Sequence, residues 1–151
     1  MAKENVQDWG NKIRHSRENH EKMVKLRQQK VDIIANELPL IKPFGKEKGD
    51  LLVIGWGGTY GALRSAVENA QENGMSVSYL HLRYLNPLPR NLGEILVKFQ
   101  KVMIAELNMG QLSTIIRSKF LVDIVSMNKV QGKPFTQTEV YKKITELVSG
   151  S

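Results

Sequence analysis

Cysteine is absent from the 151 residues of this chain. Its absence excludes disulfides, thiolate zinc sites, cysteine nucleophiles and cysteine-ligated iron–sulfur clusters within the chain. Long apolar runs are absent too: none reaches the ~18 residues of a membrane-spanning helix. The polar start of the sequence is also unlike a signal peptide. We therefore expect a cytoplasmic protein that has no membrane segment.

Charge of one sign is not concentrated anywhere along the chain. There are 22 basic and 15 acidic side chains, a net charge of +7, but no basic cluster is interleaved with aromatic residues. This pattern favours a solvated surface over a nucleic-acid interface. The three histidines have no metal-binding spacing with carboxylates, and no nucleophile-elbow motif surrounds a serine. The sequence therefore indicates no catalytic and no metal-ligating residue.

The stretch from Asp50 to Leu63 predicts how the domain is built. Leu51–Ile54 is a short apolar run with β-branched members, typical of a strand buried on both faces. Four glycines follow it: Gly55, Gly57, Gly58 and Gly61. Glycines let the chain turn sharply and pack a helix on a strand without interfering Cβ atoms. With a helical pattern opening at Thr59, the stretch predicts the entry to an α/β unit.

Ligand binding is an alternative function for this glycine turn. Gly55 and Gly57 fit the dinucleotide-binding fingerprint, but Tyr60 occupies the third glycine position. The next strand ends without an acidic residue for a ribose hydroxyl, although Arg83 could accept a 2′-phosphate. A small-molecule module for NADP or another phosphate-bearing ligand is therefore one hypothesis. The simpler interpretation is a tight turn for helix–strand packing.

The chain divides into three segments by sequence pattern. Residues 1–15 are polar and carry little periodicity, so we expect a polar, extended lead-in. Residues 16–39 place apolar side chains at helical spacing, with Ser16 as the N-cap and Pro39 at the end, and predict an amphipathic helix. This helix could pack on its own domain or across a subunit interface, including that of a dimer. Residues 40–151 are expected to form an α/β domain.

Within the α/β domain, strands alternate with helices, which predicts a mostly parallel sheet. Three further strands are expected at Met75–Leu82, Lys101–Leu107 and Val122–Met127, and Leu40–Phe44 could add an antiparallel edge. Helices should begin at three capping boxes. These boxes are Asn91 with Glu94, Asn108 with Gln111, and Thr136 with Glu139.

The carboxyl ends of the strands gather the candidate site. If Leu51–Ile54 is central, right-handed crossovers place the second and third strands on its two sides, and a crevice opens between the first and third. We expect Glu106 there, facing the glycine-turn amides or Arg83, either as a local brace or as an interface group. The full set of interface or ligand-edge candidates is Gly55, Gly57, Gly58, Thr59, Tyr60, Arg83, Glu106, Asn108 and Gln111.

Five motifs occur in an order and spacing that resemble a known family. They are HEKMVKLRQQK (20–30), GWGGTYGA (55–62), LHLRYLNPLP (80–89), AELNMGQL (105–112) and QGKPFT (131–136). Together they closely resemble the 2-oxoacid:ferredoxin oxidoreductases. The likeness is greatest to the C-terminal part of the alpha subunit of the 2-oxoglutarate enzymes.

The resemblance implies a fold and a role. The fold would be a three-layer α/β/α sandwich like the C-terminal domain of transketolase, with a five-stranded, mostly parallel sheet. The whole enzyme would decarboxylate 2-oxoglutarate oxidatively, form succinyl-CoA and reduce ferredoxin, using thiamine diphosphate, magnesium and iron–sulfur clusters. This chain lacks a G-D-G-type magnesium and diphosphate motif. We therefore expect a non-catalytic assembly domain without a cofactor of its own, whose partners are the rest of the alpha subunit, the beta subunit and ferredoxin.

Overall fold

A computed structural model describes residues 6–107, 109–129 and 132–150. The chain divides into two compact units, residues 1–38 and residues 39–151. The first unit is one helix and the second holds the whole sheet. Each unit is considered by itself below.

The N-terminal helix is longer than the sequence pattern predicts. Helix α1 runs from Val6 to Glu37, so the predicted extended lead-in over residues 1–15 is wrong from Val6 onward. A polar segment can be helical without apolar periodicity. Gly10 costs about 1 kcal/mol relative to alanine in a helix interior, which is too little to end a helix of 32 residues. The helix ends just before Pro39, as expected. Its exposed large apolar side chains lie within about half of its circumference; they are Met23, Val24, Leu26, Ile33 and Ile34.

The second unit is organised on a parallel sheet with the strand order β2-β1-β3-β4. The strands are β1 (Gly49–Trp56), β2 (Val77–Leu82), β3 (Phe99–Glu106) and β4 (Val125–Asn128). All three strand pairs are parallel, and Ile54 of β1 is aligned with Leu80 of β2 and Ile104 of β3. The first strand of the domain is therefore flanked by the second and third, as the crossover rule predicts.

The predicted fifth strand is reduced to a single bridge. Among the described residues the sheet has four strands, and Leu40–Phe44 contributes only an antiparallel bridge between Phe44 and Tyr79. Their backbones exchange two hydrogen bonds, 2.7 and 3.0 Å long. Pro43 has no N–H to donate and Gly45 turns the backbone to a φ of +114°, so the pairing cannot extend.

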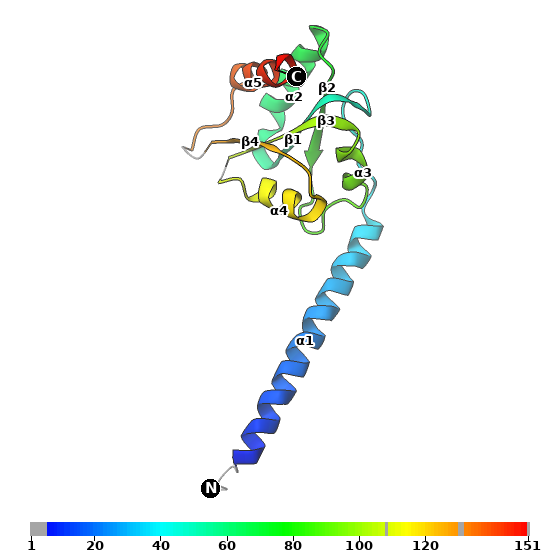
Figure 1. The fold of residues 1–151 in the computed structure, drawn as a ribbon, viewed down its shortest axis with the longest axis vertical. Helices are drawn as coiled ribbons and strands as arrows, with labels where there is room; N and C mark the ends of the chain where they lie inside the picture. Colours follow the sequence, from blue (N-terminus) through cyan, green and yellow to red (C-terminus); the bar gives the residue numbers. More distant parts are fainter. Residues whose placement is uncertain (1–5, 108, 130–131, 151) are drawn as a thin grey trace. The chain divides into compact units, whose positions relative to one another are not determined.

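Four helices cover the two faces of the sheet (Figure 1). Helices α2 (Tyr60–Glu72) and α5 (Gln137–Ser149) lie on one face, and α3 (Leu92–Leu96) and α4 (Gln111–Phe120) lie on the other. Alternate residues of β1 enter the two cores: Leu51 and Val53 pack with α2 and α5, whereas Leu52 and Ile54 pack with α3 and α4. Alternation along a strand thus produces the expected three-layer α/β/α sandwich.

The three predicted capping boxes have different outcomes. Thr136 and Glu139 form the reciprocal pair at the start of α5, which confirms that prediction. Asn91 precedes α3 but makes no cap bond; its side-chain amide instead pairs with the backbone N–H and C=O of Ile41 at 3.1 and 2.7 Å. That prediction is wrong because an unpaired backbone segment lies within reach of the amide. Asn108 lies outside the described residues, and α4 begins at Gln111, after Gly110.

Gly55 is the glycine that helix–strand packing requires. A Cβ atom added there would clash with the Leu63 side chain and lie 2.7 Å from Thr59 Oγ1. Gly61, in contrast, is at the start of α2 with open space around its Cβ position. The first glycine therefore has a packing role that the second lacks.

We expect Gly55→Ala and Gly61→Ala to have opposite effects on the free energy of unfolding. Overpacking should make Gly55→Ala cost about 1–3 kcal/mol, whereas Gly61→Ala should stabilise by up to about 1 kcal/mol because alanine is the better helix former. Urea unfolding followed by circular dichroism measures both. Equal effects would show that α2 does not pack on β1 as described.

Candidate functional site

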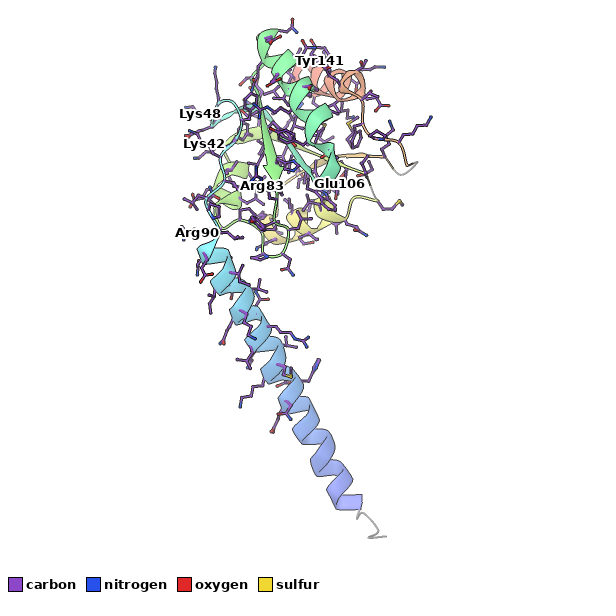
Figure 2. All side chains as sticks on the ribbon, turned by 180° about the vertical axis from the view of Figure 1, so that it is seen from behind. Lys42, Lys48, Arg83, Arg90, Glu106 and Tyr141 are labelled. Atoms are coloured by element: carbon purple, nitrogen blue, oxygen red, sulfur yellow. The ribbon has the colours of Figure 1, made fainter. Side chains whose placement is uncertain are left out.

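A buried carboxylate lies at the carboxyl edge of the sheet. Glu106 ends β3 with 0% of its surface exposed (Figure 2). Its Oε1 accepts hydrogen bonds from Trp56 Nε1 at 3.2 Å and Leu112 N at 2.7 Å. Its Oε2 accepts from Ser113 N at 3.2 Å and Ser113 Oγ at 3.1 Å. The carboxylate thus joins the ends of two neighbouring strands to the first turn of α4.

This arrangement corrects the expected partners of Glu106. The carboxylate faces the start of α4 and the Trp56 indole, not the glycine-turn amides or Arg83. The first N–H groups of a helix have no partner within the helix, and here they are buried, so the nearest acceptor binds them. A negative charge is also stabilised at a helix N-terminus. Of the two roles considered, the geometry supports the local brace.

The glycine turn after β1 lies at the same edge, and it is stabilised by contacts among its own residues. Gly57 has a φ of +64°, which favours glycine, and it begins the short 3₁₀ turn Gly57–Thr59. Thr59 is buried, and its hydroxyl donates to the Trp56 carbonyl at 3.0 Å. Gly58 has open space at its Cβ position, and Tyr60 is 44% exposed. Packing at Gly55 and the positive φ at Gly57 therefore account for these two glycines without a ligand, and neither accounts for Gly58.

The structure brings together most of the predicted site residues. The glycine turn follows β1, Arg83 follows β2, Glu106 ends β3 and Gln111 opens α4, all on the carboxyl side of parallel strands. The remaining candidate, Asn108, cannot be placed because it lies outside the described residues. Sequence reasoning missed Trp56 and Ser113 as partners of Glu106; the only signal was their position beside the glycine turn and the start of α4.

A second group of residues, of which the predicted site set contained only Tyr60 and Arg83, lies beside β2. It lines a pocket of about 380 Å³, which we call the basic pocket. Its charged or ionisable members are Lys42, Arg64, His81 and Arg83, and its aromatic members are Phe44, Tyr60 and Tyr79. These residues come from the segment before β1, from α2, and from β2 and its end. Because they are far apart in the sequence, no motif joins them.

Three ionisable groups of the basic pocket have shifted pKa values, and two of them, Tyr79 and His81, are in contact with each other. The Tyr79 hydroxyl is 2.7 Å from His81 Nδ1. Burial raises the pKa of Tyr79, so its hydroxyl is protonated at neutral pH. Burial, and then the charge of Arg83, lower the pKa of His81, which favours the neutral imidazole. His81 is therefore half-buried and in hydrogen-bond contact with Tyr79.

The residues that the structure describes do not suit a metal centre or a membrane span. They include no group of three or more histidine, aspartate or glutamate side chains that could hold a metal ion. None of their helices is long and apolar enough to cross a membrane. The oxygens of Glu106, the most buried carboxylate of the edge, are already occupied by four hydrogen bonds.

Comparison with known protein families gives a match over most of the second unit. The family described as pyruvate:ferredoxin oxidoreductase core domain II matches residues 49–140. This chain belongs to that family. The matched range includes the whole sheet, the glycine turn, Glu106 and α4, so the resemblance seen in the motifs is confirmed.

The relatives that this domain matches include subunits of 2-oxoacid oxidoreductases. The chain is 44% identical over 133 residues to 2-oxoglutarate oxidoreductase subunit KorA of Mycobacterium tuberculosis, covering 87% of this chain and 20% of the relative. It is 37% identical over 101 residues to subunit alpha of 2-oxoacid:ferredoxin oxidoreductase 1 of Aeropyrum pernix, covering 62% and 16%. The chain thus spans about a fifth of the length of the curated relatives it matches.

Solved structures agree on the fold. The 2-oxoglutarate:ferredoxin oxidoreductase of Magnetococcus marinus, solved with 2-oxoglutarate, coenzyme A and succinyl-CoA, matches with a TM-score of 0.79 and 26% identity, over 86% of this chain and 23% of that chain. A split-gene transketolase matches with a TM-score of 0.55 and 16% identity, over 69% of this chain and 40% of that one. The second match shows the transketolase-like fold alone, which the motifs implied.

The Glu106 brace of this oxidoreductase domain should dominate local stability. We expect Glu106→Gln to lower the free energy of unfolding by about 2–4 kcal/mol, because the amide nitrogen would face buried donors. Glu94→Gln is the matched control: Glu94 is also in the first turn of a helix, but is exposed, and should cost less than about 0.5 kcal/mol. Chemical unfolding measures both variants. A Glu106→Gln protein as stable as the control would contradict the brace.

Proposed function

We propose that this chain is a non-catalytic assembly domain of the alpha subunit of a 2-oxoacid:ferredoxin oxidoreductase, with 2-oxoglutarate as the 2-oxoacid. The whole enzyme would perform CoA-dependent oxidative decarboxylation to an acyl-CoA and reduce ferredoxin. Support for the substrate comes from the 44% identity to a 2-oxoglutarate oxidoreductase subunit and from the Magnetococcus enzyme, whose structure holds 2-oxoglutarate and succinyl-CoA.

One observation carries the assembly role: the carboxyl edge of the sheet exposes large apolar side chains beside a carboxylate that is already satisfied. Tyr60 follows β1, Tyr84 follows β2, and Leu107 and Met109 follow β3, and all four are exposed, Met109 to 79%. Exposed apolar side chains at one edge are typical of a contact surface. Because Glu106 is committed to the brace, this edge offers contact area and not an acid or base. We call these four residues the edge surface.

The cofactors of the whole enzyme would be bound outside this chain. Thiamine diphosphate, magnesium and iron–sulfur clusters are implied for the family, but the sequence has no cysteine to ligate a cluster and the described residues include no metal-binding group of side chains. The edge surface would instead contact the rest of the alpha subunit or the beta subunit. Ferredoxin would be reached only through the assembled complex, in the cytoplasm.

Helix α1 offers a second contact surface. Its five exposed apolar residues line one half of the helix. Such a stripe could pack against another subunit or a second copy of the chain. A dimer built on α1 would therefore be compatible with the assembly role.

The assembly role can be tested with charge substitutions at the edge surface. We expect Met109→Glu and Leu107→Glu to abolish co-purification with the remaining alpha-subunit domains and the beta subunit, because a buried unpaired charge is costly. Val97→Glu is the control, since Val97 is 74% exposed but precedes β3, at the opposite edge of the sheet. Size-exclusion chromatography of co-expressed polypeptides measures assembly, and melting curves of the isolated variants check folding.

Activity gives the second readout. The isolated chain should show no 2-oxoglutarate- and CoA-dependent reduction of an electron acceptor, and the reconstituted complex should show it only when assembly is intact. Turnover by the isolated chain would overturn the non-catalytic role. Normal assembly of Met109→Glu and Leu107→Glu would overturn the edge surface.

A further inference from the structure

The basic pocket is separate from the edge surface in its chemistry. Lys42, Arg64 and Arg83 give it three permanent positive charges, and no acidic side chain is among its lining residues. Lys42 enters from the segment before β1 and Arg83 from the end of β2 (Figure 2). Cations gathered in a concave site attract an anion and concentrate it there.

The framework of the basic pocket is held by specific contacts. The Phe44–Tyr79 bridge and the Asn91 side chain bind the segment that carries Lys42 on both of its sides. The Arg64 guanidinium lies 4.2 Å from the centroid of the Phe44 ring, which is a cation–π distance. The pocket is therefore built from residues whose backbone positions are fixed by the fold.

The three cations differ in how far they are already neutralised. Arg64 Nε donates to Glu68 at 3.3 Å, and its Nη1 donates to the Tyr60 hydroxyl. Lys42 and Arg83 form no ion pair within the part of the chain that the structure describes. Their two charges are consequently available to a ligand.

His81 adds a neutral donor to the same pocket. As part of the proposal below, we infer that the protonated Tyr79 hydroxyl, 2.7 Å from His81 Nδ1, donates to it, which would place the imidazole proton on Nε2. The ring of Tyr60 stands edge-on to this imidazole, 5.2 Å between centroids. The histidine is therefore oriented from two sides, and its Nε2–H completes a set of donors that also includes an ammonium and a guanidinium.

We propose that the basic pocket binds the phosphate group of a small organic phosphomonoester. A phosphate dianion presents three acceptor oxygens and suits a guanidinium fork, an ammonium and an N–H donor together. The volume of about 380 Å³ falls in the range of small-molecule sites, and the aromatic walls suit an apolar body beside the phosphate. This proposal does not rest on the assembly role, because Tyr60 is the one pocket residue that also belongs to the edge surface.

The test uses phenyl phosphate as the probe and the full 151-residue chain. Calorimetric titration should show binding that Arg83→Gln and Lys42→Gln each weaken at least tenfold. Lys133→Gln removes the same charge at an exposed site outside the pocket and should change the affinity less than twofold. Equal weakening by all three variants would reveal only the attraction of the net charge, and would overturn the site.

Two comparisons separate a phosphate site from other anion sites. Benzoate has the same ring with a carboxylate, and should bind at least tenfold more weakly than phenyl phosphate. Benzoate binding as tightly would overturn the phosphate assignment in favour of a carboxylate, such as one from a neighbouring domain. Absence of phenyl phosphate binding at millimolar concentration would overturn the proposal outright.

Imidazole NMR provides a readout that does not depend on affinity. The groups facing His81 are Tyr60, Tyr79, Arg64, Lys42 and Arg83, and in the free chain burial and Arg83 lower its pKa. A bound dianion should move the His81 titration to higher pH, and Arg83→Gln should remove most of this ligand effect. The imidazole signals of His20, exposed on α1, serve as the control and should not move when phenyl phosphate is added. An unmoved His81 at saturating phenyl phosphate would place the ligand elsewhere.

Discussion

The interaction on which the edge of this domain depends is the buried carboxylate of Glu106. A charge in an apolar interior is tolerated only when hydrogen bonds replace the lost water. Here four donors from Trp56, Leu112 and Ser113 surround it. Because one donor comes from the end of β1 and three come from the first turn of α4, the ends of β1 and β3 and the start of α4 are positioned together. The brace therefore occupies both carboxylate oxygens of Glu106 with hydrogen bonds inside the domain.

The two sides of the carboxyl edge are built for different purposes. On the β3 side the polar groups satisfy one another, and apolar side chains such as Leu107 and Met109 remain exposed. On the β2 side the basic pocket gathers cations around His81. The shared element is β1, whose alternating residues enter both cores. The proposed contact surface and the proposed anion site therefore lie on the same scaffold and share only Tyr60.

Local patterns predicted those features that depend on neighbours in the chain. The apolar run at Leu51–Ile54 became the central strand, and the handedness of crossovers placed β2 and β3 on its two sides. Where contacts with residues distant in the sequence decided the structure, predictions from the local pattern were wrong. Asn91 has the spacing of a capping box but binds Ile41, and Leu40–Phe44 has the composition of an edge strand but pairs at only one position. The start of α1 was missed for another reason: a polar helix leaves no periodic signal.

The sequence by itself determined the class of fold, the placement of β2 and β3 on the two sides of β1, the capping box at Thr136 and, through its motifs, the family. It also indicated that Glu106 lies at a strand end where polar groups need partners. Only the tertiary structure decided which partners these are, because Trp56 and Ser113 reach the carboxylate from separate elements. The same holds for the basic pocket, since Lys42, Arg64 and Arg83 are brought together by the packing of α2 and β2. The physical reason is that side-chain contacts depend on distance in space, which a linear pattern does not record.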